Sequence, residues 1–316
     1  MEEWITIDNR ELLSGVCGAN DGNLKIIEGL LGGLVTARGN EIRFKGSDKA
    51  GVKRFRTMMD NLITAVEEGE NPTPEYIRAL ADVFTSGNGE NQTDFHESQI
   101  HIPQGFRRVY PRSKNQASYI NGMRENEICF CVGPAGTGKT YLAIAHALQL
   151  VLSKKLRKLV LTRPVVEAGE NLGFLPGDLN QKINPYLRPL YDAMESLLPF
   201  EIIRRMEDTR AIEIAPLAYM RGRSLNDCMI ILDEAQNTTK EQMKMFLTRI
   251  GAGARAVITG DSTQIDLPRK NDSGLLHAIE ILKDITGLHF TFLHTRDVAR
   301  NPLIKKIIQA YDENKA

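Results

Sequence analysis

Eight consecutive residues, Gly133 to Thr140, have the composition and spacing of a phosphate-binding loop. Glycine occupies the first and sixth positions, and Lys139 and Thr140 follow. Glycine reaches backbone angles that a side chain forbids, so successive N–H groups can point at phosphate oxygens. We expect Lys139 to contact the β- and γ-phosphates and Thr140 to ligate Mg²⁺. The predicted phosphate-binding residues are Gly133, Pro134, Ala135, Gly136, Thr137, Gly138, Lys139 and Thr140.

The segments on either side of this loop fit the same function. Ile128 to Val132 is a short apolar run typical of a buried strand, and Tyr141 to Leu152 has the pattern of a helix. The N-terminus of such a helix adds partial positive charge where phosphates would bind. A glycine turn that binds nothing is the alternative, but the order strand, loop, helix favours a phosphate site.

A second apolar run, Met229 to Leu232, ends in two acids, Asp233 and Glu234. A strand buried on both faces can carry acids only at its carboxyl end, where parallel strands place their binding sites. We expect Asp233 to hold Mg²⁺ through water and Glu234 to orient or deprotonate an attacking water. The alternative is that two acids end this strand by chance. An acid pair here favours hydrolysis over transfer to a bound acceptor.

Two glutamines are candidates for reading the nucleotide. Gln264 follows a third apolar run, and its amide would sense a γ-phosphate unless it lies in a solvated loop. Gln116, placed 17 residues before Gly133, could pair with adenine, although glutamine is mostly a surface residue. The chain contains no Asn-Lys-x-Asp stretch for guanine, so we expect ATP rather than GTP.

The distribution of short apolar runs predicts an α/β fold and three parts. Residues 1–84 form a small α/β domain, residues 85–99 a polar, flexible linker, and residues 100–316 a nucleotide-binding domain. In the last part β-branched runs alternate with helical stretches, which is typical of parallel strands covered on both faces. The small domain contains a hairpin over Leu34 to Phe44 and a helix over Asp48 to Glu67.

Composition limits the location and the partners of the protein. Forty Lys and Arg balance forty Asp and Glu, so nucleic acid or membrane binding would need a local basic patch. No signal peptide or membrane-spanning run is present, which predicts a cytoplasmic protein. Four cysteines form no Cys-x-x-Cys pair, and Cys129 and Cys131 are expected to be buried structural thiols.

Longer runs between Ile100 and Tyr311 resemble the PhoH family of ATPases, in its YbeZ-like branch. They are Thr162-Arg163-Pro164, Gly169 to Asp178, Pro185 to Asp192, Pro216 to Arg223, Asp233 to Thr239 and Thr259 to Gln264. The resemblance implies a RecA-like core similar to the first lobe of superfamily 1 helicases, ATP hydrolysis with Mg²⁺ and association with RNA. It supports Gln116 as the adenine contact and Gln264 as the γ-phosphate sensor. It also suggests a YbeY-type endoribonuclease as partner, in RNA or ribosomal RNA metabolism.

The small domain resembles a degenerate KH module, an RNA-binding fold in which a GXXG loop clamps the backbone. The corresponding loop, Gly18 to Gly22, has one residue too many. Asp21 would repel phosphate there, and Lys25 offers one compensating charge. A structural or partner-docking module is the alternative. An intrinsic nuclease domain of the PIN type, found in another branch of the family, is disfavoured because residues 1–84 are too few.

A single RecA-like lobe lacks the arginine that a second lobe supplies to the γ-phosphate, an interaction worth roughly 10³ to 10⁵ in rate in other P-loop enzymes. We therefore expect a neighbouring subunit to provide it within a ring, which the resemblance suggests is a homo-hexamer. The candidates are Arg296 and Arg300, with Arg221 and Arg223 as alternatives, although each could instead form a surface ion pair.

Basic residues that could contact nucleic acid form two sets. Arg107, Arg108, Arg112 and Lys114 alternate with Phe106 and Tyr110, and Lys182, Arg188, Arg221 and Arg223 could line a channel. Basic residues mixed with aromatic ones suit backbone contact with stacking, but a solvated charged surface is the alternative. The competing hypothesis for the whole protein is an ATP-controlled scaffold that docks an endoribonuclease without unwinding RNA.

Overall fold

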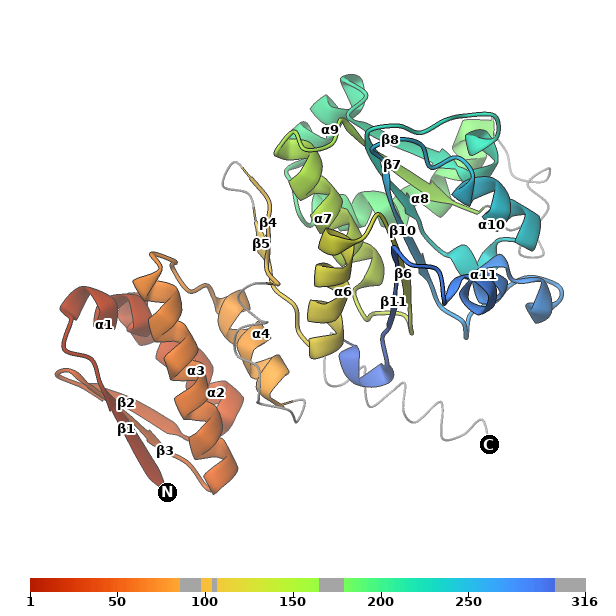
Figure 1. The fold of residues 1–316 in the computed structure, drawn as a ribbon. Helices are drawn as coiled ribbons and strands as arrows, with labels where there is room; N and C mark the ends of the chain where they lie inside the picture. The colour runs from red at the N-terminus through yellow and green to blue at the C-terminus, as the bar shows by residue number, and fades with distance from the viewer. Residues whose placement is uncertain (86–97, 104–106, 165–178, 299–316) are drawn as a thin grey trace. The chain divides into compact units, whose positions relative to one another are not determined.

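The computed structural model describes residues 1–85, 98–103, 107–164 and 179–298. The chain divides into two compact units (Figure 1). The smaller comprises Met1–Glu97 with Tyr110–Lys114, and the larger Ser98–Val109 with Asn115–Ala316. Residues 86–97, which make up most of the predicted linker, lie outside the described part, so the linker stays a prediction.

The smaller unit is a three-stranded antiparallel sheet with helices packed against it. Its elements are β1 (Glu2–Thr6), α1 (Arg10–Cys17), α2 (Gly22–Leu31), β2 (Leu34–Arg38), β3 (Glu41–Lys45), α3 (Lys49–Glu67) and α4 (Pro74–Thr85). The strands lie in the order β1-β3-β2. Alternate residues of β3, Ile42 and Phe44, point into a core that residues of all four helices complete. The Phe44 and Phe55 rings stack there, with their centroids 4.8 Å apart.

Local sequence explains the two elements predicted in this unit. The Asp48 side chain caps α3 by accepting a hydrogen bond from the Gly51 backbone N–H at 2.6 Å. The strands β2 and β3 turn at Gly39, whose φ of 63° lies in the left-handed region that glycine adopts without strain. Both the helix and the hairpin therefore occur where the sequence predicted them.

The larger unit is built around a six-stranded parallel sheet in the order β11-β6-β10-β9-β7-β8. Its strands are β6 (Ile128–Val132), β7 (Lys158–Arg163), β8 (Ile212–Pro216), β9 (Cys228–Leu232), β10 (Arg255–Gly260) and β11 (Leu288–Phe292). Its helices are α6 (Lys114–Glu125), α7 (Lys139–Leu152), α8 (Leu179–Glu195), α9 (Phe200–Asp208), α10 (Lys240–Leu247) and α11 (Gly274–Leu282). A short antiparallel pair, β4 (Ile100–His101) and β5 (Arg108–Val109), precedes them.

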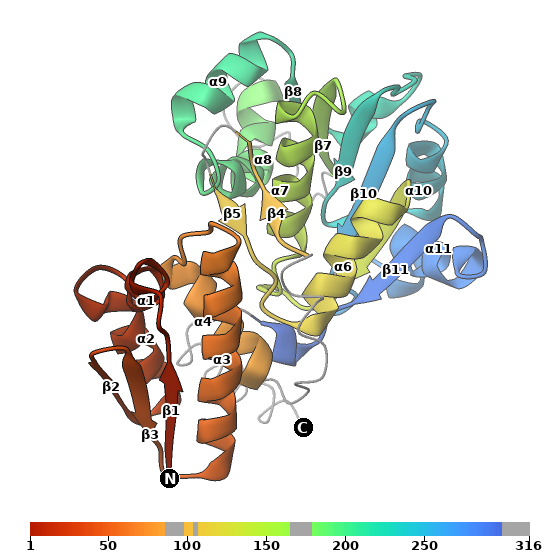
Figure 2. The same ribbon diagram turned by 60° about the vertical axis from the view of Figure 1, so that its left-hand side comes forward.

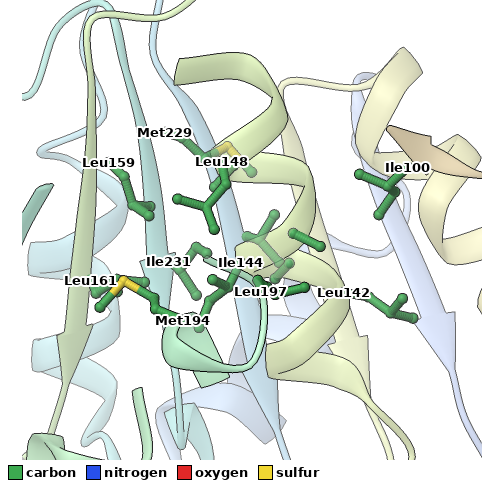
Figure 3. Packing of buried hydrophobic residues seen from close by; sticks show 14 of the residues in the cluster. Ile100, Leu142, Ile144, Leu148, Leu159, Leu161, Met194, Leu197, Met229 and Ile231 are labelled. Carbon is green, nitrogen blue, oxygen red and sulfur yellow. The ribbon is translucent and has the colours of Figure 1, made fainter. Parts of the chain in front are cut away.

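Apolar side chains on both faces of this sheet are covered by helices. Successive residues of β9, such as Ile230 and Ile231, belong to different buried clusters. One cluster packs against α6, α7, α8 and α9 (Figure 3), and the other against α10 and α11. Figures 1 and 2 show α7 and α11 on opposite faces of the sheet. The predicted α/β fold with a parallel sheet covered on both faces is confirmed.

Strand order brings chemically reactive loops together. Strand β10 lies between β6 and β9, and β7 lies on the far side of β9. Because the strands are parallel, the residues that follow all four meet at one edge of the sheet. These four strand ends therefore define where a site can form.

All four cysteines are buried and none forms a disulfide. Burial raises the pKa of the Cys129 thiol to about 12 and that of Cys228 to about 11. The pKa values of Cys17 and Cys131 are raised for the same reason. Because the thiolate is the reactive form, these side chains are inert, as predicted for Cys129 and Cys131.

None of the described helices has the length and apolar character needed to cross a membrane. A span needs about 20 mainly apolar residues. The helix α3 has 19 residues, but Lys53, Arg54 and Arg56 interrupt its apolar pattern.

His146, in the middle of α7, makes the larger unit sensitive to acid. Burial, together with the positive charges of Arg124 and Arg255, lowers the pKa of His146 to about 4. Between pH 6.5 and 4 the unfolded chain binds a proton that the folded chain excludes. The free energy of unfolding should therefore fall by about 2 kcal/mol from pH 7 to pH 5. Urea denaturation of the wild type and of His146→Leu at both pH values measures this, and an equal fall in both proteins would contradict it.

Candidate functional site

The loop Gly133–Thr140 connects β6 to α7, as the sequence predicted. Gly136 and Gly138 have φ values of 80° and 81°, which residues with a Cβ rarely adopt. The Gly133 N–H donates to the Gly260 carbonyl at 3.1 Å, so the start of the loop is held against the end of β10. The glycines thus allow the loop to wrap around the N-terminus of α7.

Lys139 lies over this loop with its ammonium group turned inward. Its Nζ donates to the carbonyl oxygens of Gly133 at 2.6 Å and Pro134 at 2.9 Å. The Thr137 hydroxyl donates to the same Pro134 oxygen at 2.8 Å. A buried cation is therefore held where the backbone N–H groups of the loop and the helix N-terminus also favour an anion.

Gln116 braces the loop from α6. Its side chain is buried, and its amide Nε2 donates to the Thr137 carbonyl at 2.9 Å. The sequence suggested an adenine contact for this residue. The structure places its amide on the loop backbone, and the adenine contact stays a prediction.

Gly133 has no space for a side chain. A Cβ built at this position would lie 2.5 Å from the Leu293 carbonyl oxygen, which is backbone and cannot rotate away. Gly133→Ala should therefore lower the free energy of unfolding by about 1–3 kcal/mol. Gly29→Ala is the matched control, because an added Cβ there meets nothing within 4 Å. Thermal unfolding of both variants measures the difference, and equal melting temperatures would refute the steric argument.

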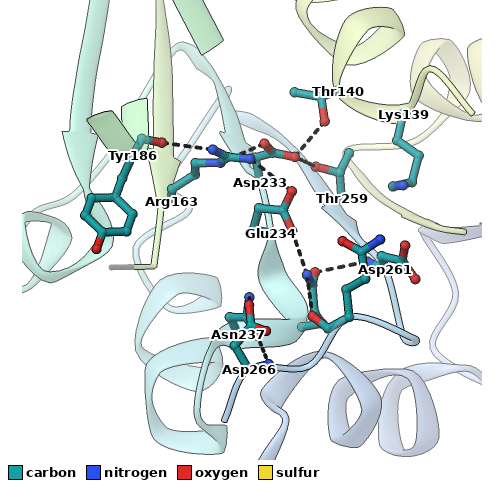
Figure 4. A network of polar contacts seen from close by, with 12 residues as sticks. Lys139, Thr140, Arg163, Tyr186, Asp233, Glu234, Asn237, Thr259, Asp261 and Asp266 are labelled. Atoms are coloured by element: carbon teal, nitrogen blue, oxygen red, sulfur yellow. Dashed lines mark hydrogen bonds and ion pairs between the residues drawn. The ribbon is translucent and has the colours of Figure 1, made fainter. Parts of the chain in front are cut away.

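Asp233 follows β9 and is 3% exposed. Its Oδ1 accepts hydrogen bonds from the hydroxyls of Thr140 at 2.6 Å and Thr259 at 2.7 Å, and its Oδ2 accepts from Arg163 Nε at 2.9 Å (Figure 4). The first acid of the pair is therefore fixed directly beside the phosphate-binding loop by residues of two other strands, β7 and β10, and of the helix α7.

Glu234 adopts a left-handed backbone conformation, with φ 55°, which is uncommon for a residue other than glycine. Its Oε1 accepts from Arg163 Nη2 at 2.9 Å and its Oε2 from Gln236 Nε2 at 2.6 Å. The side chain is 40% exposed. The second acid thus reaches solvent, whereas Asp233 does not.

Gln236 connects the acid pair to the residues after β10. Its Nε2 also donates to the Gln264 carbonyl at 3.0 Å, and its Oε1 accepts from the Asp261 N–H at 2.9 Å. Asp261 is 4% exposed, and its Oδ1 accepts from Thr263. Its other carboxylate oxygen, Oδ2, has no hydrogen-bond partner among the described residues. A buried carboxylate oxygen in this state fits a ligand that brings a donor.

These groups line a cavity of about 270 Å³ that is open to solvent. Gly136, Lys139, Thr140, Arg163, Asp233, Glu234, Asp261 and Gln264 are among the residues that line it. Cations and N–H groups on one side suit phosphates, and the hydroxyl of Thr140 with the carboxylate of Asp233 suits a hard cation such as Mg²⁺. The site can therefore bind a phosphorylated ligand together with a metal ion, and it places the acid Glu234 next to them.

The sequence predicts no role for Arg163 or Gln236, whereas Thr259 and Asp261 belong to the polar run expected next to the γ-phosphate. Each of these residues ends a predicted strand or follows one closely, which is the signal that identified Asp233. The same position after a strand therefore indicates Arg163 and Gln236 as well.

The candidate arginines and basic residues have different surroundings. Arg296 is exposed in a 3-10 turn, Thr295–Asp297, that follows β11 at the same sheet edge, and Arg300 lies outside the described residues. Arg223 forms an ion pair with Glu213, whose carboxylate raises the Arg223 pKa. Arg221 is exposed.

Other basic residues were suggested as nucleic-acid contacts. Arg107, Arg108, Arg112 and Lys114 are exposed. Arg188 is exposed as well, and it pairs with Asp192 at 2.8 Å and with Glu195 at 3.3 Å. Phe106 and the side chain of Lys182 lie outside the described part. Contact with nucleic acid stays a prediction for all of them.

A parallel sheet whose glycine loop and lysine face an acid pair on a nearby strand defines a P-loop nucleotide-binding protein. A sequence model described as "PhoH-like protein" matches residues 108–312. The chain belongs to this family of P-loop NTPases, and membership implies that it binds a nucleotide.

Three relatives, each described as a PhoH-like protein, match almost the whole chain. The protein of Mycobacterium tuberculosis is 45% identical over 95% of this chain and 85% of its own length. The protein of Bacillus subtilis is 43% identical over 94% and 92%, and that of Synechocystis 39% identical over 98% and 94%. The similarity therefore includes the smaller unit as well as the P-loop unit.

Proposed function

We propose that this protein is a Mg²⁺-dependent ATPase. The observation that carries the proposal is the position of the acid pair, with Asp233 hydrogen-bonded to Thr140 of the phosphate-binding loop at 2.6 Å and Glu234 beside it. Together with Lys139 they supply a phosphate cradle, a metal site and a base in one cavity.

The roles follow from the chemistry of each side chain. Lys139 leaves the Gly133 and Pro134 carbonyls and pairs with the β- and γ-phosphates, which compete for its ammonium as anions. The residues that would hold Mg²⁺ are Thr140 and, through water, Asp233. When bound, Mg²⁺ neutralises charge on the phosphates. Glu234 orients and deprotonates the water, because its exposed carboxylate faces the cavity.

Gln264 is proposed as the sensor of the γ-phosphate. It lines the cavity, and its carbonyl is held by Gln236, which also bonds Glu234 at 2.6 Å. A γ-phosphate that attracts the Gln264 amide would therefore act on the base through one intervening side chain.

The direct test is release of inorganic phosphate from ATP by the purified protein, with Mg²⁺ or with excess chelator. We expect hydrolysis only with the metal. Tight ATP binding without phosphate release in either condition would refute the ATPase proposal and leave a nucleotide-binding protein. GTP as a competing substrate tests the expected preference for adenine.

RNA association is a further part of the proposal. The interpretation of the large unit as a RecA-like core is supported by the position of β10 between the loop strand β6 and the acid strand β9. The interpretation of the small unit as KH-like is supported by its order of elements and its antiparallel sheet. We expect RNA to raise the ATPase rate, the chain to form a hexameric ring in the cytoplasm, and Arg296 or Arg300 to reach a neighbouring site. Turnover against protein concentration, with and without RNA and alongside mass measurement, tests these points.

The alternative function is an ATP-controlled scaffold for an endoribonuclease of the YbeY type. It is favoured by the single parallel sheet of the described residues, since unwinding in two-lobed helicases uses two such cores. A scaffold should bind its partner in a nucleotide-dependent way without separating RNA strands. Strand separation in a duplex RNA assay would exclude it.

A further inference from the structure

Arg163 is a cation that lines the cavity and has no role in the functions proposed above. It is the last residue of β7, its side chain is 14% exposed, and it lines the same cavity as Lys139 and Gln264. Figure 4 shows the acid pair, Asp233 and Glu234, between Arg163 and Lys139. The site therefore holds a second positive charge that does not belong to the phosphate-binding loop.

Three hydrogen bonds fix the guanidinium group. Nε donates to Asp233 Oδ2, Nη1 to the Tyr186 carbonyl of α8 and Nη2 to Glu234 Oε1, each at 2.9 Å. A guanidinium carries five N–H bonds, so these contacts use three of them. The remaining two can meet an acceptor in the cavity while the bonds to Asp233 and Tyr186 persist.

The hydrogen bond from Arg163 to Glu234 competes with a water for the carboxylate that is proposed as the general base. One oxygen of Glu234 accepts from Arg163 and the other from Gln236, so about half of the lone-pair sites of the carboxylate are in use before a water arrives. A γ-phosphate carries more charge than a carboxylate, and its oxygens match the planar fork of arginine. Transfer of the Nη2 bond from Glu234 to a phosphate oxygen would release Oε1 for the water and stabilise the phosphate in one movement.

We propose that Arg163 binds the γ-phosphate of the nucleotide held by its own chain, and that it leaves Glu234 when the triphosphate binds. Arg163 is then a catalytic arginine supplied in cis, in addition to any arginine from a neighbouring subunit. The proposal rests on the ATPase function above. It predicts that Arg163 distinguishes ATP from ADP, because only ATP has a γ-phosphate.

Calorimetric titration with ADP and with a nonhydrolysable ATP analogue, both with Mg²⁺, tests this. Arg163→Ala should weaken binding of the analogue at least about 10-fold and that of ADP less than about 3-fold, because a charge-assisted hydrogen bond to the γ-phosphate is lost. At saturating ATP its turnover should fall by at least about 10²-fold. Arg163→Lys keeps the positive charge but loses the planar guanidinium donors. Its affinity for the analogue and its turnover should therefore lie between those of the wild type and those of Arg163→Ala.

The control is Arg255→Ala. Arg255 begins β10 at the opposite edge of the sheet, where its Nη1 donates to the carbonyls of Met123 and Arg124. Arg255→Ala should change neither the affinity for ADP nor the affinity for the ATP analogue. Because Asp233 loses its cation in Arg163→Ala, thermal unfolding is measured for every variant. If that variant does not fold, the titration of Arg163→Lys decides the question.

A mixing experiment separates action in cis from action in trans. Arg163→Ala has an intact phosphate-binding loop, and Lys139→Ala has an intact Arg163. If Arg163 acts within its own chain, a mixture of the two variants stays inactive. Recovery of activity would overturn the proposal, and so would equal effects of Arg163→Ala on ADP and on the analogue, or no effect on either. A wild type that binds both nucleotides and does not hydrolyse ATP refutes the ATPase function alone.

Discussion

Glu234→Gln should bind ATP as tightly as the wild type and hydrolyse it about 10² to 10⁴ times more slowly, which is the usual contribution of a general base. Glutamine keeps the shape of glutamate, but its amide cannot accept the proton of water. Affinity is retained because the proposed phosphate contacts come from the loop, Lys139 and Arg163, and not from Glu234. Phosphate release under single-turnover conditions, with calorimetric affinity for an ATP analogue, measures both quantities.

Glu241→Gln is the control for this variant, because Glu241 is an exposed acid in the first turn of α10. It should hydrolyse ATP at the wild-type rate. If Glu234→Gln does so too, the base has been assigned to the wrong residue. Asp261, whose Oδ2 has no hydrogen-bond partner in the described part of the chain, then becomes the next acid to test.

Lys139→Ala should lose nucleotide binding. The ammonium group would make at least two charge-assisted hydrogen bonds to phosphate oxygens, each worth about 1.5–3 kcal/mol. The dissociation constant should therefore rise at least about 100-fold. Titration calorimetry with ADP and an ATP analogue measures the change.

Lys155→Ala serves as the comparison, since Lys155 is exposed just beyond the C-terminal end of α7. It should leave affinity unchanged. The fold should tolerate Lys139→Ala, because the Gly133 and Pro134 carbonyls that lose their donor lie at a cavity open to water. Undiminished nucleotide binding by Lys139→Ala would place the ligand elsewhere.

Features that depend on neighbouring residues in the chain could be predicted from the sequence. The Gly133 to Thr140 loop needs glycines and a following helix, and both are local properties. The hairpin at Gly39 and the cap of Asp48 are local in the same way. Burial on both faces was visible from the β-branched runs, because parallel strands covered by helices are apolar throughout.

Contacts that depend on strand order could not be predicted in this way. Arg163 and Asp233 are 70 residues apart and meet because β7 lies beside β9. Thr259 reaches the same carboxylate because β10 lies on the other side of β9. Gln116 illustrates the opposite difficulty: its residue type suggested adenine, whereas its burial under the loop follows from how α6 packs. Strand order is a property of the whole fold, and no local sequence pattern of this chain indicates it.

The buried thiols make fluorescence studies of this protein straightforward. Cys17, Cys129, Cys131 and Cys228 are all buried, and burial keeps their thiols protonated. A maleimide dye would therefore label an added surface cysteine selectively, and the four native cysteines need not be replaced. Arg188→Cys would place the dye on α8, one turn or less from the Tyr186 carbonyl that Arg163 contacts. Nucleotide-dependent movement of that helix could then be followed in real time in an otherwise native chain.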